Sequence, residues 1–276
     1  MHSTVDTADG GRPRGIEEPL NLALVHPASR ALLPVAVRLR VPPNAISITG
    51  IGFGLVAAWA YFHYERPAMA LAGFAAMLAW HVLDGLDGMT ARATGRTSDF
   101  GRFLDGFCDY SVFILVYVSL AVAAGHEAGL GVSLAAAALA GAAHVVQAAW
   151  YELQREVFIR RCAGKPGFAA RDAVGGFLEV GYNALQARLM PGAQALDAAL
   201  GADPALRVRY AETLRPVLSA AAILGATGRT LAIFIACLAG NPLWYWLWEI
   251  VGLSLAALLI ERARRVREAA LLEQTA

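Results

Sequence analysis

Four aspartates fall inside two neighbouring apolar stretches of the sequence. Asp84 and Asp87 lie near the end of one stretch, and Asp105 and Asp109 lie near the start of the next. Residues three or four apart share one face of a helix, so a helical hairpin would bring these carboxylates together. A carboxylate inside a membrane costs roughly 2.5–3.5 kcal/mol even on a lenient scale, and neighbouring carboxylates also repel one another. Something positively charged must therefore compensate them.

Divalent cations are the compensation that we expect. Arg92 and Arg102 flank the acidic residues, but no Lys or Arg lies on either acidic face. Hard cations prefer carboxylate oxygens, and four carboxylates suit two ions about 3.5–4 Å apart. Because no Cys or His belongs to the two acidic faces, we expect magnesium or manganese rather than zinc, held by all four aspartates. Helix capping and close packing at glycines would explain one or two of these residues, but not the whole set.

The composition predicts an all-α integral membrane protein. Hydrophobic residues make up 57% and charged residues 16% of the 276 residues, and the mean hydropathy is +0.49. Too few polar side chains are present to cover a surface in water, which disfavours a soluble protein. Apolar runs long enough to cross a bilayer predict six transmembrane helices. These runs cover residues 43–64, 67–91, 103–124, 129–150, 217–240 and 242–259.

Other segments are expected to flank or interrupt these helices. Residues 1–19 predict a flexible polar tail and not a signal peptide, because they contain no apolar core. Residues 20–40 predict an interfacial amphipathic helix, with an ordinary surface helix as the alternative. The six-helix domain should cover 43–265, with a cytoplasmic connection at about 157–215 that carries short interfacial helices. A C-terminal tail would follow at 266–276.

The distribution of charge predicts the topology. Basic residues such as Arg40, Arg96, Arg161 and Arg265 lie before the first predicted span and after the second, fourth and sixth. By the positive-inside rule, both termini and the acidic residues face the cytoplasm, and we expect a multi-pass protein of a bacterial inner membrane. The net charge is only +1, so no nucleic-acid partner is expected. The 3 cysteines have unrelated spacings, which indicates neither a disulfide framework nor a zinc site.

The acidic residues and their neighbours form a recognisable motif. The pattern D-x-x-D-G-x-x-A-R-x(8)-G-x-x-x-D-x-x-x-D is made by Asp84, Asp87, Gly88, Ala91, Arg92, Gly101, Asp105 and Asp109. It resembles the signature of the CDP-alcohol phosphatidyltransferase family, with every fixed position present. Pro43 and Asn44, followed by Ile46, Ser47 and Ile48, resemble the opening of the first span in that family. The resemblance weakens after Leu120.

The resemblance implies an enzyme of phospholipid biosynthesis. It would transfer a phosphatidyl or phosphoalcohol group from a CDP-linked donor, for which we favour CDP-diacylglycerol, to the hydroxyl of a small polar alcohol, and release CMP. Two metal ions would then clamp the pyrophosphate and stabilise the attacking and leaving oxygens. A homodimer is expected only by analogy with the family.

The resemblance also implies roles for individual residues. Asp84, Asp87 and Asp105 would chiefly hold metal, and Asp109 would be a ligand or the general base. The nucleotide would be bound by Asp84, Gly88, Ala91, Arg92, Ser98 and Gly101. Ser98 could instead cap the third span, and Arg92 could be a topology anchor.

Two further arginines are possible contacts for phosphate or for the acceptor. Arg229 lies inside an apolar run, so it should point towards an anion. That anion could be the aspartate cluster, but we favour a substrate phosphate because a guanidinium binds phosphate with two hydrogen bonds. Arg155 closes the fourth span and could line an acceptor pocket, or it could be an anchor beside an aromatic belt of Trp150 and Tyr151. His81 is expected to pack or to support a ligand without binding metal itself.

Other functions remain compatible with acidic residues in a membrane. The main alternative is a divalent metal cation transporter, and a structural membrane protein that uses the acids for assembly is another. The acids lie near one membrane face and no pair of broken spans recurs, which argues against transport. Choline, serine, inositol phosphate and glycerol phosphate all remain open as acceptors.

Overall fold

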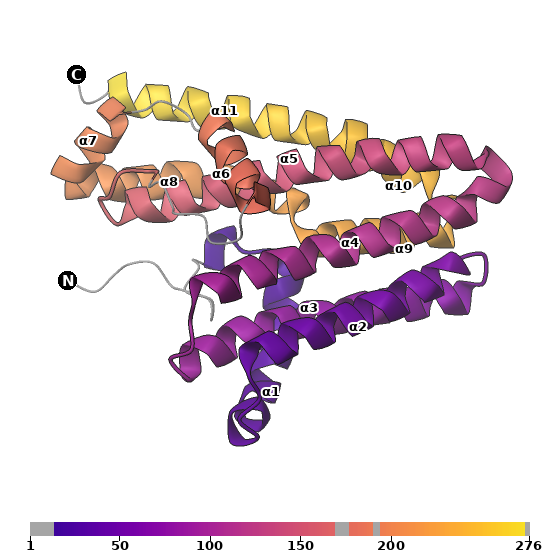
Figure 1. Cartoon of the computed structure of the whole chain (residues 1–276). Coiled ribbons are helices and arrows are strands. Elements are labelled where there is room, and N and C mark those ends of the chain that lie inside the picture. The colour runs from indigo at the N-terminus through magenta and orange to yellow at the C-terminus, as the bar shows by residue number, and fades with distance from the viewer. Residues whose placement is uncertain (1–13, 169–176, 190–193, 274–276) are drawn as a thin grey trace. The chain divides into compact units, whose positions relative to one another are not determined.

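The chain is helical throughout the part that the structure describes. The computed structural model describes residues 14–168, 177–189 and 194–273, and all regular elements in these ranges are helices (Figure 1). Five helices are long and apolar enough to span a membrane, or six if an interrupted pair is counted as one span. The predicted all-α membrane fold is therefore confirmed.

The helices divide between two compact units. The unit that contains the aspartates, here the carboxylate unit, comprises residues 19–144 and 226–251. Its helices are η2 (Asn21–Val25), α1 (His26–Arg38), α2 (Pro43–Phe62), α3 (Pro67–Ala93), α4 (Asp99–Ala128), the first part of α5 (Leu130–Cys162), α9 (Ala226–Leu238), α10 (Leu243–Leu247) and the start of η4 (Trp248–Leu253).

The second unit, here the arginine unit, contains the described residues of 1–18, 145–225 and 252–276. Its helices are η1 (Arg14–Ile16), the second part of α5, α6 (Phe177–Leu189), α7 (Gln194–Ala202), α8 (Pro204–Ala220), η3 (Ala221–Leu224) and α11 (Ser254–Glu273). Buried arginines from α5 and α11 pair with acidic residues in this unit. Arg161 bonds Asp197 at 2.7 Å and Glu268 at 2.8 Å, and Arg264 bonds Glu268 at 2.6 Å.

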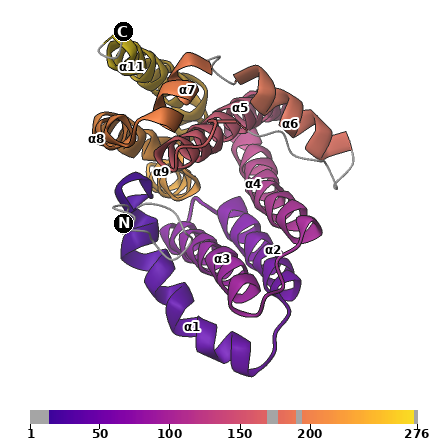
Figure 2. The same ribbon diagram turned by 90° about the vertical axis from the view of Figure 1, so that its left-hand side faces the viewer.

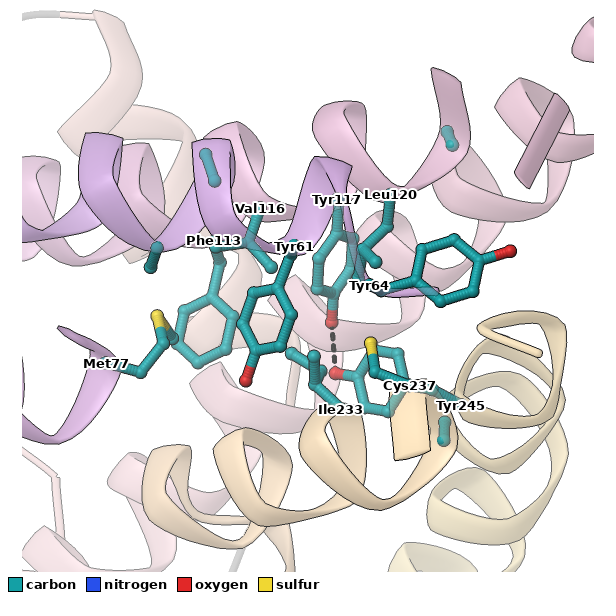
Figure 3. Close-up of a cluster of buried hydrophobic side chains, with 14 of the residues drawn as sticks. Tyr61, Tyr64, Met77, Phe113, Val116, Tyr117, Leu120, Ile233, Cys237 and Tyr245 are labelled. Atoms are coloured by element: carbon teal, nitrogen blue, oxygen red, sulfur yellow. Dashed lines mark hydrogen bonds between the residues drawn. The ribbon is translucent and has the colours of Figure 1, made fainter. Parts of the chain in front are cut away.

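The core of the carboxylate unit is made by side chains of α2, α3, α4, α9 and α10 (Figure 3). Tyr61, Met77, Phe113 and Ile233 all belong to it and are almost fully buried. α2 packs along both α3 and α4 (Figure 2), whereas the backbones of α3 and α4 approach each other less closely and meet through side chains such as the edge-on rings of Trp80 and Phe113. α2 is therefore the common neighbour of the two helices that carry the aspartates.

The turn between α3 and α4 brings the aspartates of these helices to the same end of the unit. Gly95 follows the end of α3 with φ of +66°, a left-handed conformation that glycine adopts without a steric penalty. Ser98 then caps α4, its hydroxyl accepting a hydrogen bond from the Gly101 amide at 3.0 Å. The alternative capping role of Ser98 is thus confirmed.

The first four predicted spans match helices, with differences at their ends. α4 begins at Asp99 and α5 continues to Cys162, so both are longer than their apolar runs. The fifth predicted span is interrupted at Gly225, which has an extended backbone with ψ of 163°. The side chain of Glu18 fills the space beside Gly225, where a Cβ would lie 2.0 Å from the Glu18 carboxyl carbon. Hydropathy alone could not show this interruption, because the residues on both sides are apolar.

Folded residues reach into both segments that were expected to be tails. Residues 1–13 and 274–276 lie outside the described residues, as do parts of the predicted connection at 169–176 and 190–193. Ile16 and Glu17, however, are buried in the arginine unit, and Glu17 forms an ion pair with Arg155 at 3.1 Å. At the other end, α11 continues to Glu273 because Glu268 pairs with arginines and Leu271 packs in the core. The folded chain therefore extends past the expected boundaries at residues 19 and 265.

The burial of Ile16 predicts that the N-terminal segment stabilises the protein. Ile16 is fully buried among Phe158, Leu206 and Tyr210 and other residues of its cluster. Ile16→Ala should lower the free energy of unfolding by about 2–5 kcal/mol, because it leaves a cavity in this core. Thermal unfolding of the detergent-solubilised protein would measure the loss. Ile223→Ala, at a residue 43% exposed in the same unit, is the control. Equal effects of both substitutions would contradict the structural role of the segment.

Candidate metal centre

Three of the predicted metal ligands meet in the carboxylate unit. Asp84 from α3 and Asp105 and Asp109 from α4 each offer a carboxylate oxygen, and these oxygens lie within 4.8 Å of one another. One oxygen of Asp109 is buried and has no hydrogen-bond partner among the described residues. Like charges this close repel one another, and a buried acceptor without a donor is costly. Both observations fit a divalent cation bound by oxygen ligands.

Asp87, the fourth predicted ligand, is beside this group but not part of it. Its carboxylate is buried and accepts a hydrogen bond from the hydroxyl of Ser47 on α2. It nevertheless lines one narrow pocket together with Asp84 and Asp105. The pocket is lined by Ser47, Gly50, Trp80, Asp84, Asp87, Asp105 and Cys108. A metal-binding role for each aspartate remains a prediction, but all four lie at one place in the fold.

The predicted nucleotide-binding residues surround the same end of α3 and α4. The guanidinium of Arg92 lies over Gly88, with Nη1 3.2 Å from where a Cβ would stand. A Cβ at Gly101 would likewise lie 3.1 Å from the hydroxyl oxygen of Ser98 and 3.7 Å from the side-chain oxygen of Asn44 on α2. A larger residue at Gly88 or Gly101 would push against these polar groups. Ala91 lies on the same face of α3 as Gly88 and is partly exposed.

Arg229 points towards an anion, as expected, and that anion is a glutamate. Its Nε donates to both carboxylate oxygens of Glu249, at 3.0 and 3.2 Å, and both side chains are buried. The hydroxyl of Tyr245 donates to the same carboxylate at 2.9 Å and bonds the hydroxyl of Tyr117 at 2.5 Å (Figure 3). Glu249 was overlooked in the sequence, although an ionisable residue inside the predicted span 242–259 was a visible signal.

Arg155 belongs to the arginine unit and is also paired. It bonds Glu17 at 3.1 Å and Glu152 at 3.2 Å, and its guanidinium lies 5.0 Å from the ring centre of Tyr151. Trp150 and Tyr151 are buried in a cluster with Leu224 and Leu253. An aromatic belt at these two residues is therefore wrong, because their rings pack inside the unit. The pairing of Arg155 with Glu17 joins residues 138 positions apart, which no local pattern could reveal.

His81 has the packing role that was expected. Its Nε2 is 2.9 Å from the hydroxyl of Thr230 on α9, and the centre of its ring is 4.3 Å from that of Trp80, with the two ring planes tilted by 36°. This hydrogen bond links α3 to α9 one turn before Asp84. His81 thus supports the helix that carries two of the aspartates.

Comparisons with known proteins match the part of the chain that contains this centre. The family model described as CDP-alcohol phosphatidyltransferase matches residues 40–171. An archaetidylinositol phosphate synthase from Pyrococcus horikoshii is 38% identical over 71 residues, which are 26% of this chain. The match spans about a third (36%) of the length of that curated relative.

The pairing of Arg229 predicts a stability defect on its removal. The sequence alone predicts that Arg229→Ala mainly weakens substrate binding. The structure predicts a second effect of Arg229→Ala. The free energy of unfolding should fall by about 3–5 kcal/mol, because the buried charge of Glu249 would lose its partner. Thermal unfolding in detergent would measure it. Arg229→Met combined with Glu249→Leu should recover much of the loss.

An exposed ion pair in the same unit provides the control. Arg102 and Asp99 are 2.6 Å apart and 62% and 61% exposed, so Arg102→Ala should cost at most about 1 kcal/mol. A similar loss in Arg102→Ala and Arg229→Ala would rule out a special role for the buried pair.

Proposed function

We propose that this chain, whose residues 40–171 match the model of the CDP-alcohol phosphatidyltransferase family, transfers a phosphatidyl group from a CDP-linked donor to an alcohol in phospholipid biosynthesis. The observation that carries the proposal is the meeting of Asp84, Asp105 and Asp109 at the motif shared with the family. The donor is CDP-diacylglycerol. The acceptor is a small polar alcohol, and CMP is the second product.

The aspartates would hold two ions of Mg²⁺ or Mn²⁺. Asp84, Asp105 and Asp109 supply a compact set of oxygens, and Asp87 can join them if Ser47 releases it. When bound, the ions supply positive charge that offsets both the aspartates and the pyrophosphate of the donor. Arg92 adds a cation at the edge of the site, where Gly88 leaves room for the donor's nucleotide.

Asp109 is the proposed general base. Its unpaired oxygen accepts the proton of the acceptor hydroxyl, and the acceptor oxygen then forms a bond to the phosphorus that carries the diacylglycerol. The bond between this phosphorus and the bridging oxygen of the pyrophosphate breaks, and the electron pair leaves with CMP. Gly88, Ala91 and Gly101, with Asp84, Arg92 and Ser98, would hold the cytidine end of the donor during this transfer.

The acceptor alcohol of this chain need not be the one that the relative uses. That relative is an archaetidylinositol phosphate synthase, but the likeness covers only 71 residues. Arg155 and Arg229, the arginines expected to bind phosphate, are both paired with glutamates. We therefore propose a polar alcohol without assigning it a phosphate contact.

The basic segments support a cytoplasmic site. Arg92, Arg96 and Arg102 lie in or beside the turn between α3 and α4, at the end where the aspartates meet. By the positive-inside rule, we propose that this end, and both termini, face the cytoplasm of a bacterial inner membrane. A homodimer remains part of the proposal by analogy with the family.

Turnover of a CDP-linked donor would test the proposal. Purified protein in lipid nanodiscs with Mg²⁺ should release CMP from CDP-diacylglycerol with at least one alcohol from a panel of choline, serine, inositol phosphate and glycerol phosphate. Removal of divalent ions should abolish CMP release, and Mn²⁺ should restore it. No CMP release with any acceptor, together with metal flux into vesicles, would favour the transporter instead.

Substitution of Asp109 would test the assigned base. Asp109→Asn should lower kcat by about 100- to 10,000-fold, because the amide cannot accept the proton, while the protein stays folded. Asp99→Asn is a matched control on the same helix, since Asp99 is exposed and paired with Arg102. Near-normal turnover in Asp109→Asn would show that another group takes the proton.

A further inference from the structure

The candidate metal centre bridges two helices whose backbones each approach α2 more closely than they approach one another. Asp84 comes from α3, and Asp105 and Asp109 come from α4, and these two helices meet through side chains such as the edge-on rings of Trp80 and Phe113, 5.5 Å apart between centres. α2 lies along both (Figure 2). The separation of the carboxylates therefore depends in part on what α2 places between these helices.

One face of α2 makes this contact through small residues. Ser47, Gly50 and Gly54 are spaced three and four apart, so they lie on one face of the helix. Ser47 bonds Asp87 on α3. A Cβ at Gly50 would lie 3.1 Å from Trp80 on α3, and a Cβ at Gly54 would lie 2.6 Å from Val112 on α4.

The residues that Gly50 and Gly54 contact lie on the same helix faces as the aspartates. Trp80 is one turn before Asp84 on α3 and lines the pocket with it. Val112 is one turn after Asp109 on α4. A displacement of α4 at Val112 would therefore move Asp109 relative to Asp84.

Val112 has little freedom to move away from Gly54. It is fully buried, and its branched side chain is restricted to few rotamers in a helix. Two turns further along α4, the hydroxyl of Ser119 donates to the Ala58 carbonyl of α2 at 2.5 Å, which holds the two backbones together. An added methyl group at Gly54 would be accommodated by a shift of α4 and not by a rotation of Val112.

We propose that Gly54 is a positioning residue of the metal centre, which sets the distance between α3 and α4 by its contact with Val112. Gly50 makes the corresponding contact with Trp80. The inference rests on the metal site of the proposed function. On this proposal, Gly50 and Gly54 of α2 set the distance between the carboxylates of α3 and α4, although neither glycine binds a ligand.

Mn²⁺ binding to the purified protein, without nucleotide, would test this role. Gly54→Ala should weaken Mn²⁺ affinity by at least about fivefold, because the lower end of the usual cost of overpacking corresponds to roughly a fivefold change in a binding constant. Electron paramagnetic resonance would measure free Mn²⁺ in the titration. Gly52→Ala is the matched control: it is on the same helix with nothing within 4 Å of its Cβ position, so its affinity should stay within about twofold of the wild type.

A compensating substitution separates spacing from a general loss of stability. Gly54→Ala combined with Val112→Ala should restore Mn²⁺ affinity to within about twofold of the wild type, because the smaller residue removes the clash. If Gly54→Ala does not fold, Val112→Ile enlarges the same contact from α4 and should weaken Mn²⁺ binding in its place.

Several results would overturn the proposal. One is unchanged Mn²⁺ affinity in Gly54→Ala, or in Val112→Ile where that variant replaces it. Another is that Gly52→Ala weakens Mn²⁺ binding as much as Gly54→Ala does. A third is that Val112→Ala does not restore the affinity of Gly54→Ala. Wild-type protein that binds no Mn²⁺ would overturn both this inference and the metal site. Wild-type protein that binds Mn²⁺ but releases no CMP would refute only the transferase function.

Discussion

Repulsion among carboxylates is the constraint on which the arrangement of the carboxylate unit depends. Asp84, Asp105 and Asp109 approach within 4.8 Å in a unit whose core is otherwise aromatic and aliphatic. Carboxylates at such distances cannot all remain charged without a compensating cation. The helices that carry them must also stay far enough apart to leave room for that cation. α3 and α4 meet this requirement by packing on α2 more than on each other.

Buried arginines outside the aspartate cluster each lie against a carboxylate of opposite charge. Arg229 lies against Glu249, and Arg161 lies against Asp197 and Glu268, so each buried guanidinium has a carboxylate within about 3 Å. Such pairs fix the positions of helices, because removing one partner leaves a charge inside the protein. At the aspartate cluster, carboxylates face other carboxylates. This difference separates groups that are paired within the fold from groups that are suited to binding a cation.

Local patterns predicted the elements and the acidic cluster, but not the partners of distant charges. The apolar runs placed α2 to α5 to within a few residues at most ends, and the spacing of Asp84, Asp105 and Asp109 placed them on facing helices. Both predictions rest on hydropathy and helical periodicity, which neighbouring residues determine. The partner of Arg229 could have been suspected from the isolated Glu249, but not proved, because pairing depends on how α9 and η4 pack.

The ends of the chain were mispredicted for a related reason. Residues 14–18 are polar and contain Gly and Glu, so their sequence suggests a tail. Ile16 and Glu17 are nevertheless buried, because partners for both are supplied by residues far along the chain. Similarly, the polar end of α11 is held by Arg161. A charged residue in a sequence is consistent with exposure or with a buried pair, and only the fold distinguishes them.

The residues that match the family model contain the whole candidate metal centre. Residues 40–171 include α2, α3 and α4, and hence the four aspartates and the glycines of α2 that contact Trp80 and Val112. The Arg229–Glu249 pair, α9 and α11 lie beyond the matched residues. A metal centre that held the proposed donor could serve enzymes with different acceptors, because its ions would supply charge to the donor and to the reacting oxygens and not to the rest of the acceptor. Recognition of the acceptor requires further side chains, so the likeness to an archaetidylinositol phosphate synthase over 71 residues supports the chemistry of the transfer more strongly than it supports the same alcohol.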